Sequence, residues 1–192
     1  MKTINENTNN TYIINKSKFI TFLYKVNNID EINNYLKAIK EEYKDATHVC
    51  YGYIIDNKEK FSDDAEPNGT AGMPILNVLK KNELTNIICV VVRYFGGIKL
   101  GAGGLTRAYT KSVTECLEKT KLKEIQEGYL IELTFNYENN KIIDLLLKDE
   151  IILEKNFNDQ ITYKVIINQD PNFYKKLELA AIHISILDNI KY

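Results

Sequence analysis

The chain has 192 residues, enough for one large domain or two small ones with sizeable cores. Its 25 basic and 26 acidic side chains leave a formal net charge of -1, so no overall basic field attracts nucleic acid. No apolar run approaches the roughly 18–20 residues that span a bilayer, and the polar first ten residues do not resemble a signal peptide. We expect a cytoplasmic protein without a membrane partner, in which any nucleic-acid binding comes from a local patch.

The three cysteines, Cys50, Cys89 and Cys116, are odd in number, widely spaced and form no Cys-X-X-Cys pair. A disulfide framework and a structural zinc site are both disfavoured by this pattern. We expect reduced thiols and no cofactor.

The first part of the chain predicts alternating strands and helices. Residues 1–10 offer little to bury and are expected to be frayed. Helical spacing, alternation and a continuous β-branched run mark the elements that follow. They are a strand-like stretch over 11–26 with a turn near 15–18, a helix over 30–43, a strand over 48–56, a polar loop over 57–69, a helix over about 71–82, a buried strand over 87–95, and a helix over 105–119.

After residue 121 the chain is poor in glycine and its elements follow one clear order. We predict a strand over 129–137, a helix over 139–148, strands over 151–157 and 160–168, a helix over 173–181, and a strand over 183–190. This βαββαβ order is that of the ferredoxin-like split unit. The sequence therefore predicts an α/β (α+β) protein of two domains, residues 1–124 and residues 125–192.

The segment RYFGGIKLGAGGLTRAY, residues 93–109, holds five of the nine glycines and both arginines of the chain. Glycine lets backbone amides approach a ligand closely, and the start of the following helix favours an anion. The spacing matches neither a Walker A motif nor a dinucleotide fingerprint. The expected anion-binding residues are Arg93, Gly96, Gly97, Lys99, Gly101, Gly103, Gly104 and Arg107. The alternative is a tight strand-to-helix turn that needs glycine for packing alone.

A dense acidic group, Asp63, Asp64 and Glu66, precedes the helix predicted over 71–82. These carboxylates could bind a divalent cation, hold a general base or pair with Arg93 and Arg107. Equally, they could face solvent or cap backbone amides. The metal, if any, stays unassigned.

Two further segments supply supporting residues. His48 and Cys50 lie two apart and so point to the same side of a strand, opposite Val49. A nucleophilic Cys/His pair is conceivable, but a buried cysteine and a locally bonded histidine explain the spacing better. Thr70 lies among glycines near a helix start, where backbone is exposed.

These segments together resemble the IMPACT/YigZ family, also called UPF0029. The matching stretches are ATHVCYGY, SDDAEPNGTAGMPILNVL and NIICVVVRYFGGIKLGAGGLTRAYTKSV, and the match covers roughly residues 12–120. Ala65 stands where the family usually has glycine, which suggests that positive φ is not essential there.

The resemblance implies a first domain that shares the fold of the second domain of the fifth small-subunit ribosomal protein. It implies a ferredoxin-like second domain similar to domain V of elongation factor G. Family members with an established role are eukaryotic regulators of translation. We therefore expect a non-catalytic, translation-associated regulator that binds RNA, the ribosome or another anionic partner through the glycine-rich basic segment. Two alternatives stay open: an enzyme acting on a phosphorylated small molecule with a metal at the acidic group, and a protein–protein adaptor.

Overall fold

The computed structural model describes residues 1–191 and divides the chain after Glu124 into two compact units. The first unit has two hydrophobic core clusters, and the second unit has one. The mixture of sheets and helices confirms the predicted α/β fold class.

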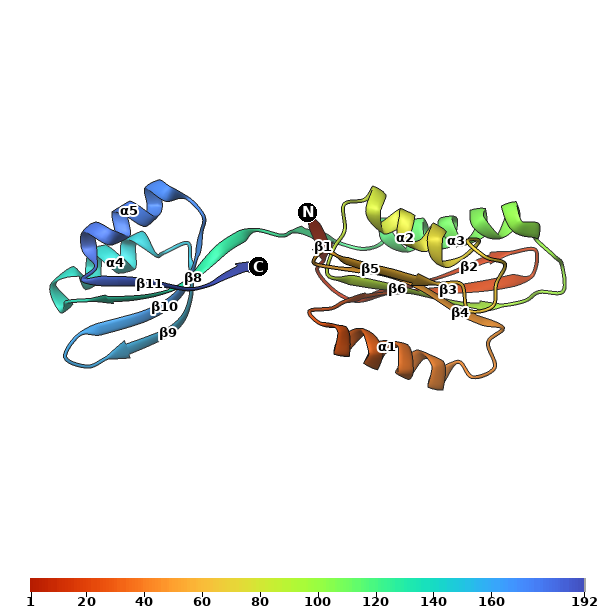
Figure 1. Cartoon of the computed structure of the whole chain (residues 1–192), viewed down its shortest axis with the longest axis horizontal. Helices are drawn as coiled ribbons and strands as arrows, with labels where there is room; N and C mark the ends of the chain where they lie inside the picture. The colour runs from red at the N-terminus through yellow and green to blue at the C-terminus, as the bar shows by residue number, and fades with distance from the viewer. Residues whose placement is uncertain (192) are drawn as a thin grey trace. The chain divides into compact units, whose positions relative to one another are not determined.

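Within residues 1–124, five strands form one antiparallel sheet in the order β2-β3-β6-β4-β5 (Figure 1). The strands are β2 (Thr8–Ile14), β3 (Ser17–Lys25), β4 (His48–Ile55), β5 (Lys58–Ser62) and β6 (Ile87–Tyr94). Strand β6 is central and buried along nearly its whole length, as its continuous apolar run predicts.

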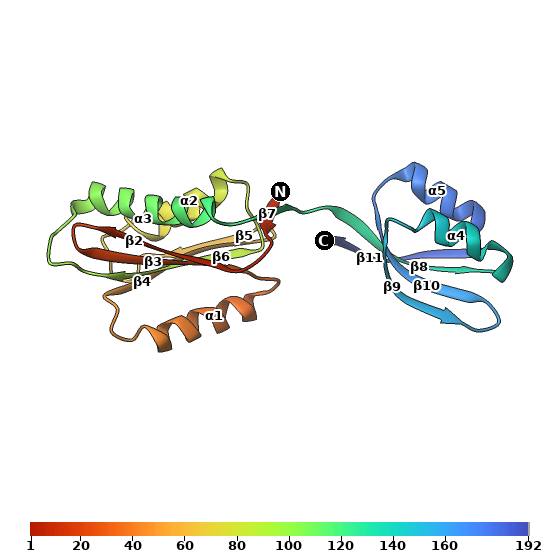
Figure 2. The same cartoon turned by 180° about the vertical axis from the view of Figure 1, so that it is seen from behind.

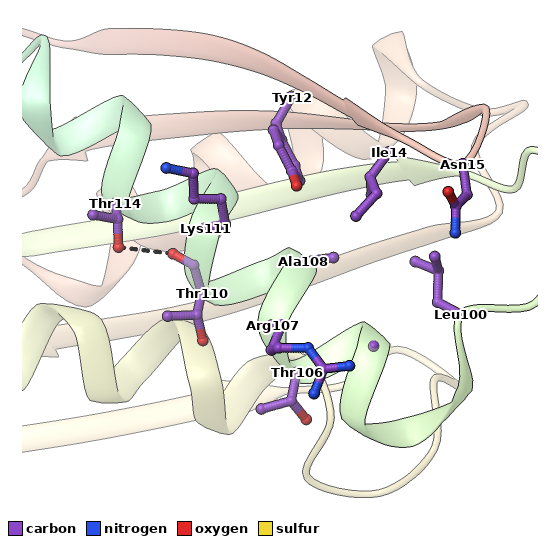
Figure 3. A pocket seen from close by; sticks show the side chains of 11 residues that line it. Tyr12, Ile14, Asn15, Leu100, Thr106, Arg107, Ala108, Thr110, Lys111 and Thr114 are labelled. Atoms are coloured by element: carbon purple, nitrogen blue, oxygen red, sulfur yellow. Dashed lines mark hydrogen bonds between the residues drawn. The ribbon is translucent and has the colours of Figure 1, made fainter.

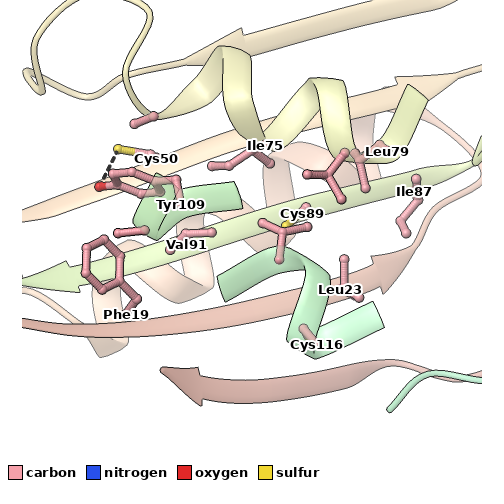
Figure 4. Close-up of a cluster of buried hydrophobic side chains, with 14 of the residues drawn as sticks. Phe19, Leu23, Cys50, Ile75, Leu79, Ile87, Cys89, Val91, Tyr109 and Cys116 are labelled. Carbon is pink, nitrogen blue, oxygen red and sulfur yellow. Dashed lines mark hydrogen bonds between the residues drawn. The ribbon is translucent and has the colours of Figure 1, made fainter. Parts of the chain in front are cut away.

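Helices cover both faces of this sheet (Figures 1 and 2). Helix α1 (Ile29–Glu42) lies on one face, and helices α2 (Gly72–Lys81) and α3 (Gly101–Glu118) lie on the other. Successive side chains of β4 point to opposite faces of the sheet, as predicted. Val49 packs in the core cluster on the α1 side, and Cys50 packs in the cluster on the α2–α3 side. Figure 4 shows the second of these cores, where Phe19, Cys50 and Tyr109 pack together.

The prediction that residues 1–10 are frayed is wrong. Strand β1 (Lys2–Ile4) pairs antiparallel with β7 (Leu122–Glu124), and β2 already begins at Thr8. The side chain of Ile4 is completely buried in the core of the first unit. A three-residue strand has no periodicity of its own, so its burial is decided by a partner far along the chain.

The expected loop over 57–69 also needs correction, because its first part forms β5 against β4. The hairpin turns at Asp56, whose φ is 49°, and β5 carries mostly exposed charged residues that hide the strand pattern. The turn between β2 and β3 is confirmed at Asn15 and Lys16, which both have positive φ, as in the tight turns that suit a hairpin.

Helix α3 begins at Gly101 and not at residue 105, so three glycines lie in its first turn. Glycine has the poorest helix propensity after proline, which is why the sequence pattern places the start of the helix too late. The backbone at Gly101, Gly103 and Gly104 therefore belongs to the first turn of α3.

The second unit confirms the predicted βαββαβ order. Its antiparallel sheet has the order β11-β8-β10-β9 and carries both of its helices on one face (Figure 1). The elements are β8 (Glu127–Phe135), a 3-10 turn η1 (Tyr137–Asn139), α4 (Asn140–Leu146), β9 (Ile151–Phe157), β10 (Ile161–Asn168), α5 (Pro171–Ala180) and β11 (His183–Lys191). The predicted bounds differ from these by two residues or fewer.

Gly96 is required for packing, because it follows β6 where the β2–β3 turn crosses closely. A Cβ atom at Gly96 would lie 2.0 Å from the backbone carbon of Lys16. The amide of Gly96 also donates to Ser17 Oγ at 3.1 Å. Gly96 therefore supports the alternative in which glycine is needed for packing in the turn between the strand and the helix.

We expect Gly96→Ala to destabilise the first domain by about 2 to 3 kcal/mol, because backbone must move to admit the methyl group. Thermal unfolding measures the loss. The matched control is Gly103→Ala, whose Cβ would contact only Arg107 Nη1, at 3.5 Å. That change is expected to stabilise the helix by about 0.5–1 kcal/mol. Equal stability of both variants would contradict the packing role of Gly96.

Candidate functional site

A buried ion pair lies between the end of β6 and the loop before α2. Arg93 Nη1 donates to Glu66 Oε1 at 2.6 Å, and the two side chains are only 6% and 3% exposed. Tyr109 of α3 donates its hydroxyl to the same oxygen at 2.8 Å. Arg93 also lies over the rings of Phe19 and Phe95, at 5.5 and 5.8 Å. The arginine is thus neutralised inside the domain and offers little free charge to an external polyanion.

Asp63 organises the loop that carries Glu66. Its Oδ1 accepts from the amides of Ala71 and Gly72, at 2.9 and 2.8 Å, and its Oδ2 accepts from Gly69 at 2.9 Å. These amides lie at and just before the start of α2, where unpaired N–H groups need acceptors. Asp63 thus caps backbone amides, one of the two interpretations left open by the sequence.

Asp64 fixes the same loop against β4, since its Oδ2 accepts from the amide of Val49 at 2.7 Å. Asp64 and Ala65 have φ values of 43° and 65°. The suggestion that positive φ is not essential at residue 65 is therefore wrong, because alanine here adopts the left-handed conformation that glycine favours. Thr70 completes the loop by donating to the carbonyl of Pro67 at 2.6 Å.

The three carboxylates do not converge on one point. Among residues 1–191, no group of three or more His, Cys, Asp and Glu side chains is arranged to hold a metal ion. Asp63 and Asp64 bind amides, while Glu66 turns inward to Arg93.

His48 is oriented by the same loop. Its Nδ1 lies 2.7 Å from the carbonyl oxygen of Asp64, and because a carbonyl only accepts, Nδ1 carries the hydrogen. The other ring nitrogen, Nε2, lies 3.8 Å from Glu66 Oε2. In the neutral form of the ring with its hydrogen on Nδ1, the Nε2 lone pair is directed to its surroundings.

Cys50 lies in the core beside His48 along β4. Its Sγ lies 3.3 Å from Tyr109 Oη (Figure 4). The same sulfur lies 3.0 Å from the carbonyl oxygen of Asp63. Burial raises the pKa of the Cys50 thiol to about 12, although the hydrogen bond to Tyr109 acts in the opposite direction. A thiol so hard to ionise is a poor nucleophile, which favours the interpretation of Cys50 as a core residue.

The remaining predicted residues lie around the start of α3, beside two hollows. One hollow, which we call the His48 cavity, has a volume of about 280 Å³. Its lining is Thr47, His48, Glu66, Pro67, Arg93, Phe95, Lys99, Leu100, Gly101, Ala102 and Leu105.

The second hollow is the β2–α3 groove, of about 610 Å³ (Figure 3). Its lining is Tyr12, Ile14, Asn15, Leu100, Gly104, Thr106, Arg107, Ala108, Thr110, Lys111 and Thr114. The structure therefore places Arg93 and Arg107 in different hollows, with Arg107 exposed and Arg93 buried. Gly97, with φ of 84°, and Gly103 line neither hollow, and a Cβ at Gly97 would meet open space.

Sequence reasoning missed several residues of this region. Tyr109 is a completely buried partner of Glu66, and Tyr12 and Lys111 line the β2–α3 groove. The thirteen tyrosines of the chain make any one of them unremarkable, but Tyr109 and Lys111 follow Arg107 on the same helix. The spacing of four residues between Arg107 and Lys111 could have placed this lysine beside the arginine on one helix face, whereas Tyr109, two residues after Arg107, faces elsewhere.

Comparisons with known proteins identify the family. A family model described as the Impact N-terminal domain matches residues 15–117. The chain belongs to the IMPACT family. IMPACT family member YvyE of Bacillus subtilis (strain 168) is 37% identical over 172 residues, which cover 87% of this chain and 79% of YvyE. IMPACT family member YigZ of Escherichia coli (strain K12) is 40% identical over 111 residues, 55% of this chain and 54% of YigZ.

A solved structure supports the fold of this IMPACT family protein. The crystal structure of a hypothetical protein aligns with 97% of this chain and 97% of its own, with a TM-score of 0.65 and 27% identity. In the part of the chain that the structure describes, no helix is both long and apolar enough to cross a membrane.

We expect Glu66→Gln to destabilise the first domain of this IMPACT family protein by about 3 kcal/mol or more, because Arg93 would stay buried without a counter-charge. Native-state hydrogen exchange of the β6 amides measures this in the first domain alone. The matched control is Glu59→Gln, which removes the exposed pair of Glu59 with Lys80. Its expected cost is below about 1 kcal/mol. A similarly small cost for Glu66→Gln would contradict the structural weight of the buried pair.

We also expect the thiols to resist alkylation in the folded protein. All three cysteines are buried, and burial raises the pKa of Cys50 and of Cys116 to about 12 and the pKa of Cys89 well above its usual value. Iodoacetamide at pH 8, followed by mass spectrometry, should label none of them until denaturant is added. Rapid labelling of Cys50 in the native protein would revive the nucleophile hypothesis.

Proposed function

We propose that this IMPACT family protein is a cytoplasmic, non-catalytic factor associated with translation, and that it binds RNA through the β2–α3 groove. The family resemblance supports the link to translation. The observation that carries the RNA-binding proposal is the composition of the groove, which combines cations, hydroxyls and an aromatic ring.

The charges of the groove suit a phosphate backbone. Arg107 and Lys111 lie four residues apart on α3 and therefore on the same face of the helix. Among the described residues that line the groove, none is acidic. Lys111 forms a pair with Glu115 at 3.5 Å, but the lysine is 55% exposed. Such a surface pair is weak, so Lys111 stays available to a phosphate.

The opposite wall of the groove suits unpaired bases. Tyr12 and Ile14 of β2 face α3 across the groove, and Leu100 lies at the end of the groove where α3 begins (Figure 3). Aromatic and apolar side chains next to a basic track form the usual platform for single-stranded RNA. Thr106 and Thr110 add hydroxyl groups along the helix, and hydroxyls commonly contact phosphate oxygens.

Gly103 adds a second argument from packing. A Cβ at Gly103 would contact only the flexible end of Arg107, so no steric reason demands glycine at this exposed position. Glycine weakens a helix by about 0.5–1 kcal/mol relative to alanine. The absence of a side chain at Gly103 leaves room for a phosphate to approach the end of Arg107.

We expect the protein to bind labelled single-stranded RNA and ribosomes at low salt, with an affinity that falls as salt rises. Replacing Arg107 or Lys111 by alanine removes one phosphate contact. Each change should reduce the slope of log K against log salt by about 0.7. Fluorescence anisotropy with an RNA oligonucleotide, measured over a series of salt concentrations, gives the slope.

The matched control is Lys37→Ala. Lys37 is exposed on α1, which covers the other face of the sheet, so this variant should keep the wild-type slope. The RNA-binding proposal fails if wild-type protein binds neither RNA nor ribosomes at low salt. It fails also if all three variants share the wild-type slope.

A further inference from the structure

At one end of the His48 cavity, Glu66 Oε2 and His48 Nε2 lie 3.8 Å apart, and among the described residues no hydrogen bond reaches either atom. Arg93 and Tyr109 both donate to Glu66 Oε1, and among the described residues no hydrogen bond reaches Glu66 Oε2. The Glu66 side chain is nonetheless 97% enclosed, with 3% exposed. Oε2 is not among the described polar atoms that are both sealed from solvent and unpartnered, so it is open to the cavity that Glu66 lines.

The second acceptor is His48 Nε2, which lies 3.8 Å from Glu66 Oε2. Because Nδ1 donates to the Asp64 carbonyl, Nε2 is an acceptor in the neutral form of the ring, whereas the imidazolium form would pair Nε2 with Glu66 Oε2. A buried carboxylate oxygen without a donor is costly, and a neighbouring lone pair adds to the demand for hydrogens. With His48 neutral, this end of the cavity therefore favours a group that donates to two acceptors at once.

The other end of the cavity has the opposite character. Gly101 and Ala102 are the first residues of the 18-residue helix α3, whose initial N–H groups have no side-chain cap. Lys99 lines the same end and is exposed. Free amides, the helix dipole and a lysine together favour an anionic group.

We propose that the His48 cavity binds a small zwitterion of the amino-acid class. Its ammonium group lies between Glu66 Oε2 and His48 Nε2, and its carboxylate lies at the start of α3. A hydroxyl has one hydrogen and can donate to only one of the two acceptors, whereas an ammonium has three and also matches the carboxylate charge. A bridging water also satisfies both acceptors, so the ammonium must displace it.

The volume and position of the cavity set it apart from the RNA groove. At about 280 Å³ its volume lies just below the usual range for ligand pockets, so it suits only a small metabolite. The two linings share only Leu100 among the described residues. The zwitterion site therefore does not depend on RNA binding, and either can fail without the other.

The test is a thermal-shift screen of the 192-residue chain with each proteinogenic amino acid in turn at millimolar concentration. Calorimetry then gives the affinity of the best one. Three analogues of that amino acid separate the two ends of the site. The N-acetyl derivative and the hydroxy acid lack the ammonium, and the amide lacks the carboxylate. We expect each analogue to bind at least tenfold more weakly than the amino acid.

His48→Asn gives the sharpest variant. The asparagine amide nitrogen stands at the same number of bonds from Cβ as Nδ1, so it can still donate to the Asp64 carbonyl, while the Nε2 acceptor is lost. We expect a loss of at least tenfold in affinity with an unchanged circular dichroism spectrum. His183→Asn, in β11 of the other unit, is the matched control and should bind like the wild type.

Lys99→Ala probes the anionic end and should weaken binding several-fold without affecting the fold, because Lys99 is exposed. The proposal is overturned if no amino acid stabilises the protein at saturating concentration. It is overturned equally if the hydroxy acid binds as well as the amino acid, or if folded His48→Asn protein keeps the wild-type affinity.

Discussion

The buried pair of Arg93 and Glu66 is the interaction on which the first domain's site depends. It joins the end of the central strand to the loop before α2, and Tyr109 extends the connection to α3. Two buried charges are tolerable only because each satisfies the other and the rings of Phe19 and Phe95 cover the guanidinium. The pair also determines which oxygen of Glu66 is used internally and which one faces the cavity.

The start of α3 divides the surface around it into two chemical environments. Gly101 lines the compact His48 cavity, and Gly104 lines the longer β2–α3 groove. Different glycines of one segment therefore have different reasons to be glycine. Gly96 is needed for the close approach of the β2–β3 turn, Gly101 has φ of 70°, and Gly103 has neither constraint. The glycines of residues 96–104 therefore do not share one structural role.

Much of the fold could be predicted from the sequence, because long elements carry their own periodicity. The run of β6, the alternation of β4 and the βαββαβ order of the second unit all belong to this class. The strands β1 and β5 are short or charged, so their pairing depends on partners that no local pattern reveals.

The site was harder to predict. Arg93 ends a run of residues buried on both faces of the sheet, so the sequence gives no sign of which face it takes. Glu66 belongs to a loop, where no period applies, and only the fold brings it to Tyr109.

The pairing of β1 with β7 has a further consequence for how the first domain is made. Strand β1 leaves the ribosome first, yet Leu122, which pairs with Ile4, follows roughly 6 to 24 s later at ordinary rates of synthesis. Strand β1 can pair with residues near Leu84 earlier, but its pairing with β7 forms only after that interval.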